Sequence, residues 1–157
     1  MKIIVVDLDG TLCDSSHRDH LAQAKEWDAF HAASKDDKPR PDVAELLKIV
    51  RSSAFAGRDY CLVALTGRNE KYRKITLDWL IRQDLAHFDA LLMRPDNDWR
   101  PDTVIKPELL EEFRKLIGEG QGGPNPEVAF ILEDRDHVVE AWRNLGFACW
   151  QVQPGGY

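Results

Sequence analysis

Two aspartates stand directly behind an apolar run at the start of the sequence, IIVVDLDGT, where Asp7 and Asp9 are separated by one leucine. In a strand, side chains two residues apart point to the same side, so the two carboxylates would lie together. Burying a carboxylate without a compensating partner is costly, and neighbouring carboxylates repel each other. The aspartates could cap backbone amides in a turn, or they could serve a chemical site.

Polar residues also follow other apolar runs. They are Thr66, Gly67 and Arg68 after one run and Glu133 and Asp134 after another, with Lys106 at a predicted helix start between them. Because the carboxyl ends of parallel strands meet at one edge of a sheet, we expect these residues to meet Asp7 and Asp9. Carboxylates that meet raise one another's pKa unless a cation compensates, and Mg²⁺ prefers such oxygen ligands. The pattern predicts a magnesium site.

Each of these residues also has a simpler interpretation. Thr66 could cap a turn or a helix, and Lys106 could be an exposed residue before Pro107, which suits a first helical turn. Glu133 and Asp134 could form a solvated turn. Their joint occurrence at predicted strand ends favours a shared site.

Strands and helices alternate along the chain. Apolar runs of strand length occur at Lys2–Val6, Tyr60–Leu65, Ala90–Met93, Val128–Leu132 and Phe147–Val152. Segments of helical periodicity occur at Pro41–Ala54, Glu70–Ile81, Pro107–Ile117 and His137–Leu145. The alternation predicts an α/β, Rossmann-like, three-layer fold with a parallel sheet. The glycine-rich segment 118–126 is predicted to be a loop.

A segment after the first strand does not fit this alternation. Between about residues 14 and 38, apolar residues recur at helical spacing at Leu21, Ala24, Trp27 and Phe30, which predicts one helix. Because it follows the carboxyl end of a strand, this helix is a candidate partial lid; it could also be a surface helix that packs its own apolar stripe. We expect one domain over residues 1–157 with a small helical cap at about 14–38.

Composition excludes several classes. The chain has 43% apolar and 31% charged residues and a formal charge of −6, so a general basic field for long nucleic acid is absent. Three cysteines without a CxxC pair fit a reducing compartment. The first apolar run is too short for a membrane span or a signal sequence. We expect a cytoplasmic protein without membrane association, and the oligomeric state stays open.

The motifs DLDGTL, LTGR, a later lysine and EDRD, in this order, resemble those of the haloacid dehalogenase (HAD) superfamily of aspartate-nucleophile phosphatases. The resemblance implies that Asp7 attacks phosphorus to form an aspartyl-phosphate and that Asp9 is the general acid and base. Thr66 and Lys106 would hold the phosphoryl oxygens. Mg²⁺ would be held by Asp7, the backbone carbonyl of Asp9 and Asp134, with help from Glu133.

Most of the chain also resembles the 3′-phosphatase domains of bacteriophage polynucleotide kinase-phosphatases. The resemblance is most specific in the C-terminal segment HVVEAWRNLGFACWQVQPGGY. It implies that Arg18, Gly67, Arg68 and Asp102 serve the substrate. An arginine fork can grip phosphate through two donors. Arg18 could instead be a surface residue and Arg68 a member of an ion pair at a helix start. Asp102 could cap the helix predicted at Pro107 or pair with a neighbouring residue.

Further residues bear on the substrate. Trp27 and Trp99 could stack a base or be packing residues, and a group of cations could form a basic track or a solvated face. These cations are Lys71, Arg73, Lys74, Arg94 and Arg100.

The sequence contains no G-x-x-x-x-G-K-[ST], so we expect no kinase domain in it. The leading hypothesis is a Mg²⁺-dependent phosphomonoesterase acting on polynucleotide 3′-phosphate ends. Alternatives are a nucleotidase or small-metabolite phosphatase, and a non-catalytic module that binds metal or a partner.

Overall fold

A five-stranded sheet forms the centre of the computed structural model, which describes residues 1–52 and 60–155. The strands are β1 (Lys2–Val6), β4 (Tyr60–Asn69), β5 (Ala90–Arg94), β6 (Glu127–Arg135) and β7 (Cys149–Gly155). They lie in the order β5-β4-β1-β6-β7, and each neighbouring pair is parallel. The predicted α/β class with a parallel sheet is confirmed.

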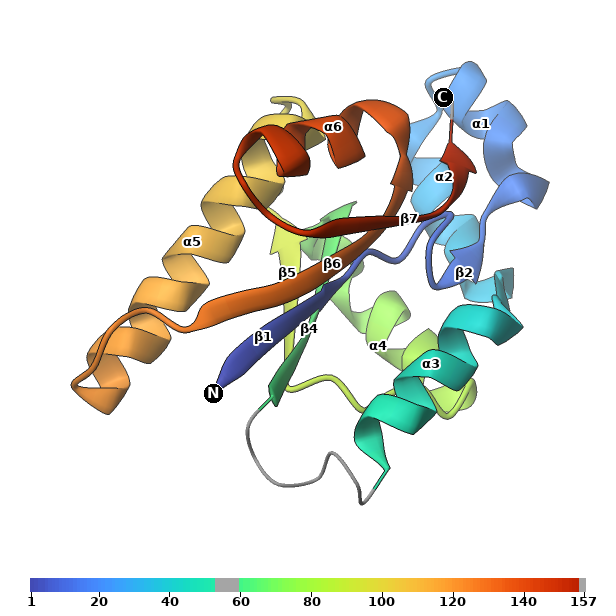
Figure 1. Ribbon diagram of the computed structural model, residues 1–157. Coiled ribbons are helices and arrows are strands. Elements are labelled where there is room, and N and C mark those ends of the chain that lie inside the picture. Colours follow the sequence, from blue (N-terminus) through green and yellow to red (C-terminus); the bar gives the residue numbers. More distant parts are fainter. Residues whose placement is uncertain (53–59, 156–157) are drawn as a thin grey trace.

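Helices cover both faces of the sheet (Figure 1). They are α3 (Pro41–Arg51) and α4 (Arg73–Arg82), with the short 3-10 helix η3 (Glu70–Tyr72) before α4, and α5 (Asp102–Gln121) and α6 (Asp136–Asn144). In the central strand, Ile4 and Val6 pack in one apolar cluster with α3 and α4, while Ile3 and Val5 pack in another with α5 and α6. Burial on both faces explains the continuous apolar runs. Within 1–52 and 60–155, no helix is both long and apolar enough to cross a lipid bilayer.

The last residues of the predicted helix after Pro41, residues 53 and 54, lie outside the described residues. The helix that contains Pro107 differs from the prediction at both of its ends. Helix α5 begins at Asp102, and Pro107 lies inside it, so the predicted start at Pro107 was wrong. The missing N–H of Pro107 removes only one helical bond, and buried Ile105 and Leu110 hold the helix on both sides of the proline.

The far end of α5 also runs into the glycine-rich segment predicted to be a loop. The helix continues to Gln121, and only the residues from Gly122 onward are a loop. A helical glycine costs about 1 kcal/mol, which burial elsewhere in a long helix can offset.

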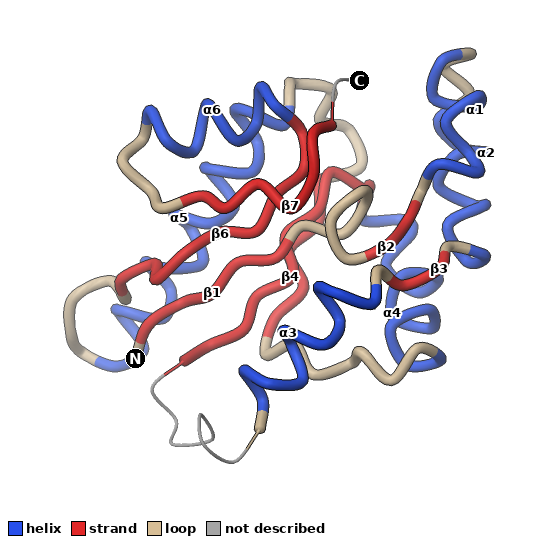
Figure 2. Tube along the Cα trace, turned by 45° about the vertical axis from the view of Figure 1, so that its right-hand side comes forward, coloured by secondary structure: helices blue, strands red, loops and turns tan. Residues whose placement is uncertain are grey.

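The segment at 14–38, which we call the cap, lies beyond the carboxyl ends of the strands (Figures 1 and 2). It holds η1 (Ser16–Arg18), α1 (Asp19–Gln23), α2 (Trp27–Ala32) and η2 (Ala33–Asp36), closed by the antiparallel strands β2 (Cys13–Asp14) and β3 (Lys38–Pro39). The prediction of one helix was wrong, because Lys25 adopts a left-handed φ of 60° between α1 and α2. Helix α1 has no buried side chain, so packing there is too weak to hold one continuous helix.

A tight turn connects β1 to the cap. The Leu8 carbonyl accepts hydrogen bonds from the amides of Thr11, Leu12 and Cys13 at 3.2, 2.9 and 2.9 Å. Gly10 has a φ of 84°, a conformation that side chains with a Cβ rarely adopt. The turn leaves Asp7 and Asp9 at the carboxyl end of the central strand.

Candidate active site

The strand ends bring the predicted acidic residues together around Lys106. The Lys106 Nζ donates to Asp7 Oδ1 at 2.8 Å and to Glu133 Oε2 at 2.7 Å. Single carboxylate oxygens of Asp7, Glu133 and Asp134 lie within 4.8 Å of one another. We call these four residues the Asp7 cluster. All four are buried.

Helix α5 places two functional candidates on one face. Because the helix begins at Asp102, Lys106 lies one turn further along, and residues four apart are neighbours on a helix surface. Lys106 points into the Asp7 cluster, while Asp102 pairs with Arg94 and, at 3.0 Å, with Arg135. The structure gives Asp102 no side-chain capping bond, so the capping interpretation was wrong.

The Asp7 cluster has shifted proton affinities. Burial and, to a lesser extent, the neighbouring Glu133 raise the pKa of Asp7 to about 7, although Lys106 acts to lower it. Burial likewise raises the pKa of Glu133 and of Asp134. Burial alone would lower the pKa of Lys106, but the carboxylates of Asp7 and Glu133 raise it above its ordinary value. Three buried carboxylates around one lysine therefore disfavour their own ionisation.

This donor set fits a hard divalent cation. Asp7 and Asp134 offer buried carboxylate oxygens, which Mg²⁺ prefers, and a bound cation would favour their ionised forms. Glu133 is already engaged: Oε2 accepts from Lys106, and Oε1 accepts from the Asp134 amide at 3.2 Å. Gly155 leaves room for the Asp134 carboxylate, since a Cβ at position 155 would lie 2.7 Å from Asp134 Oδ2.

A second cluster surrounds Asp9 and joins the cap to the sheet. Arg68 donates through Nε to Asp9 Oδ2 at 3.0 Å and through Nη2 to Asp37 Oδ2 at 3.0 Å. Arg18 also pairs with Asp9, and it donates to Asp37 from Nε at 2.8 Å and from Nη2 at 2.6 Å. We call Asp9, Arg18, Asp37 and Arg68 the Asp9 cluster. All four are buried, so the surface interpretation of Arg18 was wrong.

The two arginines of the Asp9 cluster keep the carboxylate of Asp9 ionised. Burial alone would raise the pKa of Asp9, but the Arg68 and Arg18 guanidinium groups lower it well below its ordinary value. Nearby, burial lowers the pKa of His31 to about 4, so its imidazole is neutral at neutral pH.

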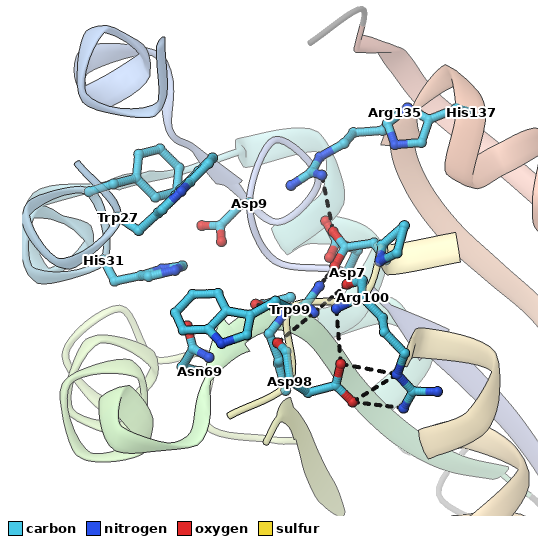
Figure 3. A pocket seen from close by; sticks show the side chains of 15 residues that line it. Asp7, Asp9, Trp27, His31, Asn69, Asp98, Trp99, Arg100, Arg135 and His137 are labelled. Carbon is cyan, nitrogen blue, oxygen red and sulfur yellow. Dashed lines mark hydrogen bonds and ion pairs between the residues drawn. The ribbon is translucent and has the colours of Figure 1, made fainter. Parts of the chain in front are cut away.

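A cavity of about 320 Å³ opens above Asp7 and Asp9 (Figure 3). Of the predicted site residues, Asp7, Asp9, Gly67 and Asp102 line it. The others are buried behind this lining: Arg18, Thr66, Arg68, Lys106, Glu133 and Asp134. Gly67 is required here because a Cβ would lie 2.7 Å from Asp102 Oδ1. The Thr66 hydroxyl accepts a hydrogen bond from the Arg68 amide at 3.3 Å.

Sequence reasoning missed three residues of this region. Asp37 binds both buried arginines, Arg135 lines the cavity and pairs with Asp102, and His31 lines the cavity from the cap. Arg135 stands directly after the acidic pair and could have been noticed there. Asp37 and His31 lie in the cap, where no motif or strand end indicated a role.

The predicted basic track is neutralised. Each of its five cations has a carboxylate partner: Lys71 with Asp28, Arg73 with Glu70, Lys74 with Asp78, Arg94 with Asp102 and Arg100 with Asp98. Such paired side chains do not form a free positive surface. The structure therefore favours the alternative, a charged face balanced within the protein.

Comparison with known proteins finds one family and several similar structures. The sequence model of the polynucleotide kinase PNKP phosphatase domain matches residues 1–157. A chain of the Pnkp1/Rnl/Hen1 RNA repair complex is 32% identical with a TM-score of 0.77, over 99% of this chain and 43% of that chain. A chain of a second Pnkp1/Rnl/Hen1 structure is 33% identical with a TM-score of 0.76, over 99% and 47%. This chain thus spans less than half the length of those relatives.

More distant structures share the fold. A HAD-superfamily hydrolase from Geobacter sulfurreducens is 15% identical with a TM-score of 0.59, over 95% of this chain and 85% of that chain. At this identity the likeness concerns the fold alone. It agrees with the parallel sheet and its two helical layers.

Proposed function

This chain belongs to the polynucleotide kinase PNKP phosphatase domain family and is a phosphatase, and on that premise we propose that it is a Mg²⁺-dependent phosphomonoesterase for nucleic-acid 3′-phosphate ends. The observation that carries the proposal is the position of Asp7. Its carboxylate lies at the end of the central strand, lines the cavity and is 2.8 Å from the Lys106 ammonium. With Mg²⁺ bound, which would favour the ionised form of Asp7, a phosphate entering the cavity would meet an anionic nucleophile beside the positive charge of Lys106.

The proposed reaction has two steps. In the first, an Asp7 oxygen attacks phosphorus, the bond from phosphorus to the sugar oxygen breaks, and Asp9 donates a proton to that leaving oxygen. In the second, Asp9 takes a proton from water, and the resulting hydroxide attacks phosphorus, which releases phosphate and restores Asp7. Lys106 would stabilise the charge on the phosphoryl oxygens.

The Asp9 cluster sets a condition on the first step. Asp9 is ionised while it contacts Arg18 and Arg68, which suits a base but not an acid. A phosphate bound at Asp7 would bring negative charge beside Asp9, and a nearby like charge raises the pKa of a carboxyl group. Substrate binding would thereby oppose the effect of the two arginines and allow Asp9 to carry the proton that the leaving oxygen needs.

The metal would be held by Asp7, Asp134 and the Asp9 backbone carbonyl. When bound, Mg²⁺ would supply positive charge to the phosphoryl oxygens. Glu133 would act through Lys106, because both of its oxygens already accept hydrogen bonds. Thr66, by the family resemblance, would offer its hydroxyl to the phosphoryl group.

Two findings support a nucleic-acid end as substrate. The family is that of a polynucleotide kinase phosphatase domain, and similar chains occur in an RNA repair complex. By contrast, the track of paired cations offers no support for binding a long strand. We therefore propose recognition of the terminal nucleotide rather than of an extended backbone.

The test follows phosphate release from a 3′-phosphorylated oligonucleotide, its 5′-phosphorylated isomer, nucleoside monophosphates and sugar phosphates, with Mg²⁺ or with a chelator. We expect turnover of the 3′-phosphorylated end, dependent on Mg²⁺. Equal turnover of all small esters would instead identify a general phosphatase.

Asp7→Asn tests the nucleophile. The substitution keeps the shape of the side chain but removes the attacking carboxylate, so we expect kcat to fall by at least about 10³-fold. Asp42→Asn, a change of the same kind on an exposed residue of α3, is the matched control. Full activity of Asp7→Asn would exclude an aspartyl-phosphate.

A further inference from the structure

We propose that Trp99 and His31 form a nucleoside subsite, in which the base of the terminal nucleotide stacks on Trp99 and a polar group of the nucleoside bonds to His31. This inference rests on the proposed function and specifies which part of the substrate is recognised. The two residues come from different segments, the loop after β5 and helix α2 of the cap.

Trp99 is an exposed indole at the cavity. It lines the cavity that contains Asp7 and Asp9, yet 77% of its surface is accessible, so packing does not explain its position. Figure 3 shows the ring lying across the cavity between His31 and Asp98. A flat aromatic face of this kind binds bases by stacking.

The loop that presents Trp99 is held by its own hydrogen bonds. Arg94 Nη1 donates to the carbonyls of both residues that flank Trp99, Asp98 at 3.1 Å and Arg100 at 2.6 Å. The Arg100 amide and its guanidinium both donate to the Asp98 carboxylate. The backbone on either side of the exposed indole is therefore fixed before any ligand binds, which lowers the entropy cost of stacking.

His31 lines the same cavity and has a buried polar atom that is not used in any hydrogen bond to the described residues. Only 7% of the residue is exposed, and its Nδ1 has no hydrogen-bond partner among residues 1–52 and 60–155. The ring is packed against Phe30 and Tyr72, at centroid distances of 5.3 and 4.9 Å. A buried polar atom without a partner is costly, and a ligand hydrogen bond in the cavity would remove that cost.

His31 and Trp99 lie on the side of the cavity where the leaving nucleoside would be. Asp9, which would protonate the leaving sugar oxygen, and His31 face the same part of the cavity (Figure 3). A phosphate at Asp7 would thus direct its nucleoside past Asp9 toward the cap and Trp99. The subsite requires a base, which sugar phosphates lack.

The stacking contact is tested with two 3′-phosphorylated oligonucleotides that differ only in the last residue, a normal nucleotide or an abasic sugar. For wild type, we expect kcat/KM to be about 5- to 150-fold higher with the base, the range of a single stacked base. Trp99→Ala should lower kcat/KM for the base-bearing end to the value for the abasic end, and it should leave kcat/KM for the abasic end unchanged. Trp99→Phe should retain most of the preference.

Trp150→Ala is the matched control, because Trp150 is 54% exposed, stacks on Phe130 and does not line this cavity. It should leave both rates unchanged. An equal loss on both ends in Trp99→Ala, or no loss on either, would overturn the stacking proposal.

The polar contact is tested by His31→Leu and His31→Asn, since the asparagine amide places a polar atom close to the position of Nδ1. We expect His31→Leu to lower kcat/KM on the base-bearing end by about 2- to 10-fold, the range for one neutral hydrogen bond, and His31→Asn to restore it. Equal rates in the two variants would show that His31 only packs.

Binding separates the subsite from the proposed function. The affinity of Asp7→Asn for a 3′-phosphorylated mononucleotide and for its abasic counterpart is measured with and without Trp99→Ala. A loss of the base preference in the double variant supports the subsite even if no oligonucleotide is hydrolysed. Equal affinities for the two ligands in Asp7→Asn itself would refute the subsite even if the phosphatase acts on 3′ ends.

Discussion

The Asp7 cluster and the Asp9 cluster are both buried, and Asp7 and Asp9 are only two residues apart in the chain, yet the pKa values of these two aspartates are shifted in opposite directions. Burial raises the pKa of Asp7 to about 7, whereas Arg68 and Arg18 overcome burial and hold the pKa of Asp9 well below its ordinary value. The first cluster has three carboxylates around one lysine. The second has two carboxylates and two arginines.

This difference shows that the spacing of carboxylates does not by itself indicate a metal site. Potential ligand atoms of Asp9, Cys13 and Asp37 lie as close together as those of Asp7, Glu133 and Asp134. In the Asp9 cluster, two guanidinium groups already supply the positive charge that a metal would bring. In the Asp7 cluster, one lysine faces three carboxylates, so a cation would improve the charge balance. We therefore propose that Mg²⁺ binds in the Asp7 cluster rather than in the Asp9 cluster.

Removing Asp37 should break the balanced cluster and have the largest effect on stability. Asp37→Asn leaves Arg18 and Arg68 buried with Asp9 as their remaining carboxylate partner in the cluster. We expect the free energy of unfolding to fall by about 3–5 kcal/mol, the cost of breaking a buried ion pair. Urea unfolding measures this change. Asp36→Asn alters an exposed neighbour and should have little effect, so equal losses in the two variants would contradict the assignment.

The Asp7 cluster should bind Mg²⁺ more weakly as the pH falls. Below pH 7 Asp7 carries a proton that the metal must displace, so the apparent affinity should fall about tenfold per pH unit, or about 1.4 kcal/mol. Mg²⁺ titrations followed by thermal unfolding at pH 6, 7 and 8 measure the trend. Asp7→Asn should make the apparent affinity less dependent on pH, with the raised pKa of Asp134 accounting for what remains. An affinity for Mg²⁺ that is independent of pH in wild type would contradict this prediction.

Without metal, the raised pKa of Asp7 makes the folded protein less stable, not more stable, as the pH rises. Because the pKa of Asp7 is raised from 3.8 to about 7, the folded protein binds a proton that the unfolded chain releases between these values. This contribution to stability is present at low pH and is lost as the pH rises toward 7. Chelator-treated protein should therefore lose stability over this range, and Mg²⁺ should restore it.

An exposed ion pair between Asp28 and Lys71 should contribute much less to stability than the buried ion pairs of the Asp9 cluster. Asp28 in the cap accepts from Lys71 Nζ at 2.7 Å and from the Tyr72 hydroxyl at 2.5 Å, on the protein surface. Solvent screens such contacts, so Asp28→Asn should change kcat/KM by less than about twofold and stability less than Asp37→Asn does. A larger loss would show that this contact holds the cap in place.

Much of this architecture could be read from local patterns. The five strands of the central sheet were predicted near their observed positions because a strand buried on both faces needs a continuous apolar run, whereas the short strands β2 and β3 were not predicted. The residues after those runs then had to meet, since parallel strands end at one edge of the sheet. The contact of Lys106 with Asp7 and Glu133 agrees with that expectation, while the chemical roles of these residues stay predictions.

Other features depended on contacts between distant segments. Whether α5 starts at Asp102 or Pro107, whether the cap is one helix or two, and whether Asp37 binds Arg18 and Arg68 are decided by burial and charge pairing across the chain. Periodicity reports which side of an element is buried, but not which charged group lies opposite it. The raised pKa of Asp7 and the lowered pKa of Asp9 therefore follow from the tertiary structure, which pairs two arginines with Asp9 and a single lysine with Asp7.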